Sequence, residues 1–421
     1  MLDIKFIREN PGKVREGLEK KGVDFDLDHL LAVDEKRRAK IKEVDDLRSG
    51  QNAASDEIAK LAGEERAQKI AAAQGLKAGL SDSELELKAL EEEFNQLLNQ
   101  IPNLPHDDVP VGRGESENKV LREVGSRPSF DFEPKDHTVL GEALGVIDFE
   151  RAAKVSGSGF YYLKNEGVLL EFALVNYALD FLAGRGFTLC FTPDLARSRF
   201  YLGTGYTPRG DEAQIYEIKE QDLGLIATAE VALAGLHADE TLDGESLPLR
   251  YAGYSHCFRQ EAGSYGKYSK GLYRLHQFTK VEMFVYARPE ESEAMHCELL
   301  SAEEELWRGL GIPYRVLEMC AGDLGSQAAR KFDLEAWMPG RGDWGEVTST
   351  SNTTDYQARN LGIRYRGKSG EGGFVHTLNG TAIATSRGII AILENFQQKD
   401  GSVEIPEALQ KYMRGTKEIR R

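Results

Sequence analysis

Two heptad runs near the N-terminus constrain the fold of this chain more than any other feature. In each run, residues recur at alternating steps of four and three, which is the a and d spacing of a coiled coil. Gly63 and the acidic pair Glu64-Glu65 lie between the runs, as the end of one helix and the start of another would. The pattern therefore predicts two antiparallel helices joined by a short turn. The first run is Val33, Arg37, Lys40, Val44, Leu47, Gln51, Ala54, Ile58 and Leu61, and the second is Leu76, Leu80, Ser83, Leu87, Leu90, Phe94, Leu97 and Ile101.

The hairpin should span about residues 30–101 and project from the body of the protein. Each helix of about 30 residues would be about 45 Å long. The second helix has a weak stretch, with Gly75 and Gly79 ahead of the sequence Ser81-Asp82-Ser83-Glu84. This stretch favours a break, in which Ser81 is an N-cap and Glu84 closes a capping box.

A linker separates the hairpin from the rest of the chain. The sequence from Ile101 to about Gly114 is polar and rich in Gly and Pro. Beyond it, β-rich segments such as 253–258, 279–286 and 373–378 are separated by amphipathic helices. We therefore predict an α+β protein with an N-terminal domain over residues 1–112 and one large domain over 113–421.

Composition excludes several classes of protein. The formal net charge of −16 argues against nucleic acid, although binding depends on local patches such as the basic cluster at residues 36–42. The four cysteines are far apart and form no C-x-x-C pair, so we expect reduced thiols, a cytoplasmic location and no zinc. No apolar run approaches the roughly 20 residues that span a bilayer, and the charged N-terminus has no secretory signal, so no membrane is expected.

The segment from Phe258 to Phe284 carries the strongest chemical signal. Its ends are β-like and its middle is a polar loop with glycines, so we expect Arg259 and Arg274 on adjacent strands. Arg binds phosphate in a bidentate, permanently charged fork, and two of them suit a polyphosphate. Phe278 could stack on a nucleobase. The alternative is that these arginines only pair with Glu261 and Glu282.

A second cluster lies toward the C-terminus. The strand-like sequence 377–381 leads into an apolar helix, and Arg387 near the start of that helix opposes its dipole, which suggests an anionic ligand. Upstream, Glu346 and Ser349 offer a carboxylate and a hydroxyl in an extended segment, and both are oxygen ligands that Mg²⁺ prefers. The alternative for the upstream segment is an ordinary edge strand.

These segments resemble the motifs of a known enzyme family. Residues 258–261, F-R-Q-E, resemble motif 2 of class II aminoacyl-tRNA synthetases, Arg387 matches the arginine of motif 3, and residues 185–205 with Pro193 resemble motif 1. Residues 228–230, 320–337, 350–360 and 377–387 resemble the seryl-tRNA synthetase family specifically, as does the helical hairpin, which is that family's tRNA-binding arm. The resemblance covers essentially the entire chain. It implies an antiparallel β-sheet class II catalytic domain preceded by a long antiparallel coiled-coil hairpin.

The resemblance also implies the reaction and its partners. L-Serine would be activated with ATP and Mg²⁺ to seryl-adenylate, and serine would pass to the 3′ end of tRNA(Ser), with tRNA(Sec) as a second acceptor. Motif 1 implies a homodimer. Attack by the serine carboxylate requires no general base, so alignment and charge neutralisation should suffice. The residues implied as catalytic are Arg259, Arg387 and Glu346.

Further roles follow from the resemblance residue by residue. Arg259 should hold the α-phosphate and the serine carboxylate, and Glu282 should take the ammonium group. The serine-binding set is Thr228, Ala229, Glu230, Arg259, Glu282, Asn379 and Thr381, of which Asn379 and Thr381 address the hydroxyl. The ATP-binding set is Arg259, Gln260, Glu261, Arg274, Leu275, Phe278, Glu346, Val347, Thr348, Ser349 and Arg387, and Glu346 and Ser349 should bind Mg²⁺.

Two rival functions remain open from the sequence. One is a non-translational relative that loads an amino acid onto a carrier protein, which would be expected to lack the long arm. The other is an inactive RNA-binding or regulatory protein, which should have lost Arg259, Arg387 or Glu346. The chain also departs from the family pattern at Tyr268, which replaces an acidic residue in the motif 2 loop and puts the acceptor-stem contacts of that loop in doubt.

Overall fold

The computed structural model describes residues 1–206, 215–261 and 270–421. The chain divides into two compact units, Met1–Pro102 and Asn103–Arg421, so the linker residues 103–112 group with the second unit. Tyr268 and most of the loop around it lie outside the described residues. None of the described helices is both long and apolar enough to cross a membrane.

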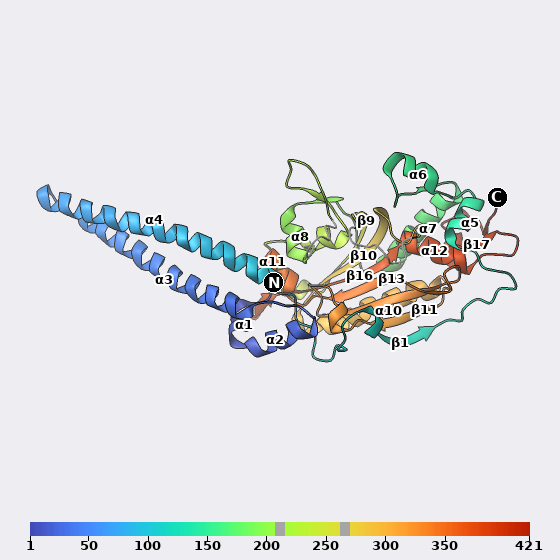
Figure 1. Ribbon diagram of the computed structural model, residues 1–421, viewed down its shortest axis with the longest axis horizontal. Helices are drawn as coiled ribbons and strands as arrows, with labels where there is room; N and C mark the ends of the chain where they lie inside the picture. The colour runs from blue at the N-terminus through green and yellow to red at the C-terminus, as the bar shows by residue number, and fades with distance from the viewer. Residues whose placement is uncertain (207–214, 262–269) are drawn as a thin grey trace. The chain divides into compact units, whose positions relative to one another are not determined.

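The first unit is built around the predicted helical hairpin. Helices α1 (Ile4–Glu9) and α2 (Pro11–Lys20) precede α3 (Leu27–Ile58) and α4 (Gly63–Gln100), and α3 and α4 run side by side along their length (Figure 1). The carboxylate of Asp26 caps α3 by accepting a hydrogen bond from the backbone N–H of His29 at 2.9 Å. Every residue of the two heptad runs is buried or half-buried, so the coiled-coil prediction is confirmed.

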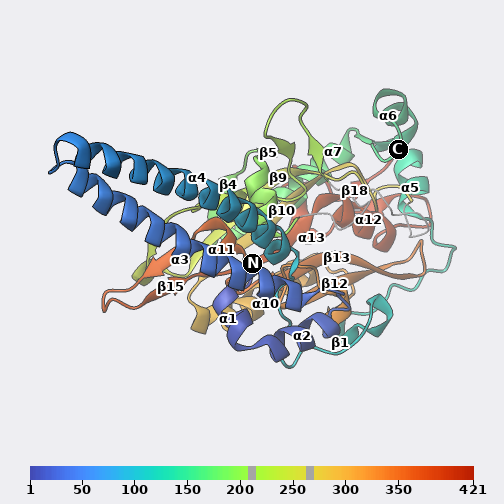
Figure 2. The same ribbon diagram turned by 60° about the vertical axis from the view of Figure 1, so that its left-hand side comes forward.

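The predicted break in the second helix is wrong. Helix α4 continues from Gly63 to Gln100, and Figure 2 shows it without interruption. The polar side chains that suggested a capping box instead cross the hairpin. Ser83 Oγ donates to Glu43 Oε1 at 2.7 Å, and Glu84 Oε1 accepts from Arg48 Nη2 at 2.8 Å. Packing and hydrogen bonding against α3 therefore outweigh the weak helix propensity of this stretch.

The second unit contains a mixed, mainly antiparallel sheet of eight strands in the order β1-β11-β12-β13-β16-β10-β9-β4. All neighbouring pairs are antiparallel except β4 and β9, which are parallel. The α+β prediction with an antiparallel catalytic sheet is confirmed. The strands are β1 (Lys119–Val124), β11 (Tyr314–Glu318), β12 (Arg330–Met338), β13 (Asp343–Asn352), β16 (His376–Ala384), β10 (Gln277–Ala287), β9 (Leu249–Phe258) and β4 (Thr188–Phe191).

Helices and short strands surround this sheet. The helices are α5 (His137–Ala143), α6 (Phe149–Ser156), α7 (Glu166–Ala183), α8 (Ser198–Thr204), α9 (Ala229–Gly235), α10 (Ser292–Gly309), α11 (Tyr356–Leu361), α12 (Thr385–Asn395) and α13 (Glu407–Gln410). The short strands are β2 (Ile147–Asp148), β3 (Tyr162–Leu163), β5 (Leu195–Ala196), β6 (Tyr216–Glu217), β7 (Gly224–Leu225), β8 (Thr241–Asp243), β14 (Arg364–Arg366), β15 (Gly372–Phe374), β17 (Val403–Glu404) and β18 (Glu418–Ile419). The β-rich segment predicted at 373–378 is thus shared between β15 and β16.

Strand β10 shows how the sheet separates core from site. Successive side chains on a strand point to opposite faces. Val281, Met283 and Val285 belong to the large hydrophobic core that also contains residues of α7, α10 and α12. Glu282 lies between them in sequence and faces a cavity on the other side of the sheet. The face of β10 with Val281, Met283 and Val285 is therefore part of the large core, whereas the other face presents Glu282 to the cavity before Phe284 and Tyr286 enter a smaller hydrophobic cluster.

Candidate active site

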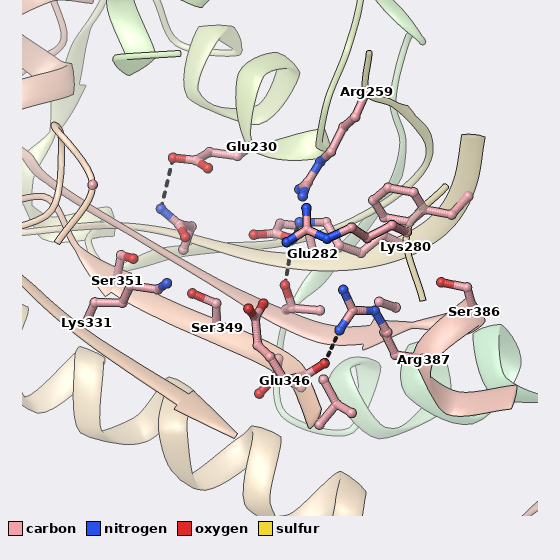
Figure 3. Close-up of a pocket in the computed structure, with 18 of the residues that line it drawn as sticks. Glu230, Arg259, Lys280, Glu282, Lys331, Glu346, Ser349, Ser351, Ser386 and Arg387 are labelled. Carbon is pink, nitrogen blue, oxygen red and sulfur yellow. Dashed lines mark hydrogen bonds and ion pairs between the residues drawn. The ribbon is translucent and has the colours of Figure 1, made fainter. Parts of the chain in front are cut away.

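The cavity that Glu282 faces has a volume of about 340 Å³. Side chains from β10, β16, β13 and β12 form it, together with the segments that follow β9 and precede β10 (Figure 3). Every predicted site residue lines the cavity except Thr228, Ala229 and Gln260. Folding therefore gathers into one place residues that lie between positions 230 and 387 in the sequence.

The three exceptions have local roles near the cavity. The Thr228 hydroxyl is the N-cap of α9 and accepts a hydrogen bond from the backbone N–H of Glu230 at 3.2 Å. Ala229 is fully buried in the hydrophobic cluster around α9. Gln260 Nε2 donates to the carbonyl oxygen of Ile215 at 2.7 Å. Thr228 thus fixes the start of the helix that carries Glu230.

Arg259 and Arg274 lie beyond the strands on which they were expected. Strand β9 ends at Phe258 and β10 begins at Gln277, so that prediction is wrong. The backbone N–H of Arg259 still donates to the carbonyl oxygen of His276 at 3.0 Å, and Arg274 lies between the turn at residues 271–272 and the start of β10. The Arg259 Cζ lies 5.2 Å from the centroid of the Phe278 ring, which keeps the guanidinium next to the aromatic face.

The alternative of simple ion pairing holds for one of these two arginines. Arg274 Nη1 lies 2.9 Å from Glu261 Oε2. Arg259 instead donates from Nε to the carbonyl oxygen of Ala227 at 3.4 Å, and its guanidinium extends toward Glu282 across the cavity (Figure 3). The cationic group of Arg259 is therefore presented to the cavity.

The guanidinium of Arg387 lies over the ring of Tyr273, a residue that was not predicted to belong to the site. Arg387 lies in the first turn of α12, and its Cζ is 3.6 Å from the centroid of the Tyr273 ring. Its Nη1 also donates to the carbonyl oxygen of Glu346. Tyr273 immediately precedes Arg274, but no spacing in the sequence predicts that it stacks on a residue more than a hundred positions away.

A β-bulge aligns Glu346 with Ser349. Side chains three residues apart on a regular strand point to opposite faces. Between β12 and β13 the register shifts, since Leu334 pairs with Thr348 but Glu335 pairs with Glu346, which leaves Val347 as an extra residue. Glu346 and Ser349 consequently both point into the cavity (Figure 3). Strand β13 lies between β12 and β16, but only its residues 350–352 pair with β16, so among the described strands the segment 346–349 pairs with β12 alone.

The charges around Glu346 keep it ionised. Burial alone would raise its pKa, but the positive charges of Lys331, Arg387, Arg259 and Arg274 hold the pKa of Glu346 below its ordinary value. Its neighbour Asp333 behaves differently, because burial raises the pKa of Asp333 to about 7. Glu346 is therefore a stable anion within a cationic surrounding.

The cavity holds two further carboxylates, Glu230 and Glu282. Glu230 Oε1 accepts hydrogen bonds from Gln357 Nε2 at 2.8 Å and from Asn379 Nδ2 at 2.9 Å. Burial, followed by the nearby charge of Glu282, raises the pKa of Glu230 to about 7. Glu282 forms an ion pair with Lys280 and accepts a hydrogen bond from Thr381 Oγ1 at 3.5 Å. Lys280 was not predicted, although its spacing two residues before Glu282 on a strand could have indicated a shared face.

The donor set is consistent with a magnesium ion that depends on a ligand for most of its coordination. Across residues 1–206, 215–261 and 270–421, no group of three or more His, Cys, Asp or Glu side chains could hold a metal ion. Mg²⁺ is usually bound through one or two protein oxygens together with substrate phosphates. Glu346 and Ser349 provide such a pair of oxygens beside the arginines.

Comparison with known families matches both parts of the chain. Residues 1–105 match the seryl-tRNA synthetase N-terminal domain, and residues 215–396 match the tRNA synthetase class II core domain (G, H, P, S and T). The serine–tRNA ligase of Rubrobacter xylanophilus is 56% identical over 98% of both chains.

Solved structures give the same result. The seryl-tRNA synthetase from Pyrococcus horikoshii, crystallised in complex with ATP, superposes with a TM-score of 0.90 at 46% identity over 100% of this chain and 99% of that chain. The cytoplasmic serine–tRNA ligase from Naegleria fowleri, in complex with AMP, gives a TM-score of 0.85 at 36% identity over 100% and 99% of the two chains.

Proposed function

Because this chain belongs to the seryl-tRNA synthetase family of class II aminoacyl-tRNA synthetases, we propose that its cavity of about 340 Å³ is where L-serine is activated with ATP. The reaction of the chain is the ligation of serine to tRNA. The inactive-protein alternative predicted loss of Arg259, Arg387 or Glu346, and all three residues line the cavity.

The observation that carries this proposal is that one cavity contains fixed groups of both charges. The cations of Arg259, Arg274 and Arg387 line the cavity, and so do the carboxylates of Glu230, Glu282 and Glu346. ATP is a polyanion, and serine at neutral pH carries an ammonium as well as a carboxylate. Each substrate charge therefore meets an opposite charge when both substrates are bound.

Arg259 has the central position in the first step. Its guanidinium would neutralise the serine carboxylate and the α-phosphate as they approach, while Arg274 and Arg387 would hold the outer phosphates. Phe278, whose ring packs beside Arg259, would stack under the adenine. Glu261 would lie near the adenine, the Leu275 backbone would border it, and the segment 346–349 would follow the phosphates.

The chemistry of that step needs alignment more than proton transfer. The serine carboxylate oxygen attacks the α-phosphorus of ATP, the bond to the bridging oxygen breaks, and pyrophosphate leaves with the electron pair. A carboxylate is already a nucleophile at neutral pH, so fixed positive charge and orientation supply the catalysis. In the second step, a hydroxyl of the 3′-terminal ribose of tRNA attacks the seryl-adenylate carbonyl and displaces AMP.

Glu346 and Ser349 would bind Mg²⁺ together with the ATP phosphates. The ion, when bound, neutralises charge on the phosphates and orients them for in-line displacement. The residues of the chain prepare this site, since the bulge at Val347 directs both oxygen ligands into the cavity. The surrounding cations keep Glu346 ionised and available as a ligand.

We assign the serine ammonium to Glu230 rather than to Glu282. Glu282 already pairs with Lys280, whereas the described partners of Glu230 are the neutral amides of Gln357 and Asn379. Thr381 and Glu282 then address the serine hydroxyl. A site that hydrogen-bonds a hydroxyl rejects an analogue that lacks it, because its own polar groups would be left unpaired. This rejection excludes alanine and glycine.

The helical arm would bind tRNA(Ser) by shape and backbone contacts. In the basic cluster at its base, Arg37 and Arg38 pair with Asp34, and Lys40 pairs with Glu43 and Glu86. Most of these cations are thus engaged within the arm, which argues against a dense phosphate-binding patch. Aminoacylation assays with transcripts of tRNA(Ser) and tRNA(Sec) measure whether tRNA(Sec) is also an acceptor. The cytoplasmic location of the protein stays a prediction.

A homodimer would form along the exposed sheet edge at β4. This strand ends the eight-stranded sheet, and its side chains Leu189 and Phe191 are exposed, with Phe191 73% accessible. An exposed apolar edge strand favours pairing with another chain. Sedimentation should give the mass of a dimer for the native protein and a monomer for Phe191→Glu. A monomeric native protein would overturn this part of the proposal.

Serine-dependent exchange of pyrophosphate into ATP tests the activation step. We expect exchange with L-serine and not with alanine, threonine or glycine, and we expect Arg259→Ala to lower it at least about 1,000-fold. Absence of exchange with every amino acid would refute the proposal. Transfer to tRNA(Ser), measured against transfer to a carrier protein, distinguishes a tRNA ligase from a carrier-loading relative.

A further inference from the structure

The cavity contains a buried ion pair that the activation chemistry does not require. The Lys280 and Glu282 side chains are 8% and 2% exposed, and both line the cavity. They lie two residues apart on β10, so they share one face of the sheet. Their ion pair is therefore formed within one strand and needs no group from another element.

The carboxylates of Glu282 and Glu230 are consequently not equivalent. Glu282 is compensated by the cation of Lys280, and it also accepts the hydroxyl of Thr381. Glu230 is 3% exposed and is bonded to the amides of Gln357 and Asn379, which carry no charge. A buried ion is stabilised by an opposite charge, and Glu230 forms no ion pair among the described residues, although the charges of Lys280 and Arg259 act on it from a distance.

A second bulge fixes the position of this pair relative to Thr381. Between β10 and β16 the register shifts, since Val281 pairs with Ile383 but Glu282 pairs with Thr381, which leaves Ala382 as an extra residue. Thr381 therefore lies directly opposite Glu282. The pair Lys280–Glu282 and the Thr381 hydroxyl together form a polar surface on which one negative and one positive charge balance.

We propose that Lys280 is a specificity-determining residue. Because its cation pairs with Glu282, this carboxylate binds the uncharged hydroxyl of the substrate side chain, and an amino acid with a side-chain ammonium is rejected. This inference rests on the proposed binding of serine in the cavity. The ligand class that Lys280 would reject is the α-amino acid with a short cationic side chain. L-2,3-Diaminopropionate, in which an amino group replaces the serine hydroxyl, is the closest such compound. The ammonium of its side chain would meet the Lys280 cation beside a carboxylate that is already paired.

The rejection depends on charge and not on size. An amino group and a hydroxyl have nearly the same volume, so the shape of the pocket would not separate the two amino acids. Without Lys280, Glu282 would lose the cation with which it forms its ion pair and would favour the ammonium more strongly. The discrimination against the cationic analogue would then be weaker.

The test compares two substrates within each variant. Lys280→Met removes the charge and keeps a long side chain, and Lys280→Arg is the matched control that keeps the charge. Amino-acid-dependent ATP–pyrophosphate exchange gives kcat/KM for L-serine and for L-2,3-diaminopropionate. We expect Lys280→Met to raise the ratio of diaminopropionate to serine by roughly 10- to 100-fold, the range for one hydrogen bond to a charged group, while Lys280→Arg changes it by less than about threefold.

A general structural loss would lower both values together and leave their ratio unchanged, and that result would overturn the inference. If Lys280→Met shows no exchange, calorimetric binding of the sulfamoyl analogues of seryl- and diaminopropionyl-adenylate gives the same ratio without catalysis. The double variant K280M/E282Q removes both charges and should lower the ratio of diaminopropionate to serine again. Failure of the proposed function would be distinct, because the unmodified protein would then exchange with neither amino acid.

Discussion

Serine activation should depend on pH through Glu230. This carboxylate is buried between the amides of Gln357 and Asn379, and its pKa is raised to about 7. If Glu230 takes the serine ammonium, only its ionised form binds well, and a proton competes with the substrate. The apparent affinity for serine should therefore fall as the pH drops through about 7.

The size of the effect follows from that pKa of about 7. The ionised fraction of Glu230 in the free enzyme would be about 0.9 at about pH 8 and about 0.1 at about pH 6. Because kcat/KM reports the free enzyme, kcat/KM for serine should fall about tenfold across this interval. At saturating serine the bound ammonium holds Glu230 ionised, so kcat should change much less.

ATP–pyrophosphate exchange, measured between about pH 6 and about pH 8, separates kcat/KM, obtained at low serine, from kcat, obtained at saturating serine. Glu230→Gln is the control, because an amide oxygen can still accept the bonds from Gln357 and Asn379 but does not titrate. We expect its kcat/KM for serine to be roughly 10- to 100-fold lower and nearly independent of pH, since a hydrogen bond to a charged group contributes about 1.5–3 kcal/mol. A flat profile for the unmodified protein, or the same slope in Glu230→Gln, would refute this reasoning.

Three other changes have defined outcomes. Tyr273→Leu removes the ring on which Arg387 stacks and should raise the KM for ATP by roughly 3- to 10-fold, whereas Tyr273→Phe keeps the ring and should leave it unchanged; equal effects would contradict the stacking role. Glu346→Gln should raise the Mg²⁺ concentration for half-maximal exchange at least about tenfold, and an unaltered requirement would exclude Glu346 as a ligand. Gly79→Ala, at a helical position with open space around it, should stabilise α4 by up to about 1 kcal/mol and so slow its amide hydrogen exchange. Gly63→Ala, at a φ of +64°, should destabilise the start of α4 and accelerate the exchange. Slower exchange in both variants would show that backbone conformation is not the cause.

Much of the architecture was predictable because it depends on local patterns. Heptad spacing alone indicated both helices of the arm, since the same residues that recur in sequence must form one face of a helix. The break expected near Ser81 was wrong because local propensity does not include the bonds that Ser83 and Glu84 make to α3. Local signals therefore identified the elements, and a neighbouring helix decided whether one of them was continuous.

The candidate site was predictable as a set of residues more than as a geometry. Resemblance to the family selected residues such as Arg259 and Arg387, which the fold brings to one cavity. It could not select Tyr273, whose role depends on a contact with Arg387 far away in sequence. It also could not select Lys280, whose role depends on the face of the sheet that it occupies. The role of the Thr228 hydroxyl as the N-cap of α9 was likewise not predictable from the motif.

The sequence by itself determined that this chain has a coiled-coil arm and a class II catalytic domain, because periodicity and motif spacing are properties of the chain. Only the tertiary structure decided how the charges meet. The bulges at Val347 and Ala382 set which side chains face the cavity, and one extra residue in a strand reverses the faces of all residues beyond it. Register between strands is fixed by long-range packing and hydrogen bonding, so the alignment of Glu346 with Ser349, and of Glu282 with Thr381, exists only in the folded sheet.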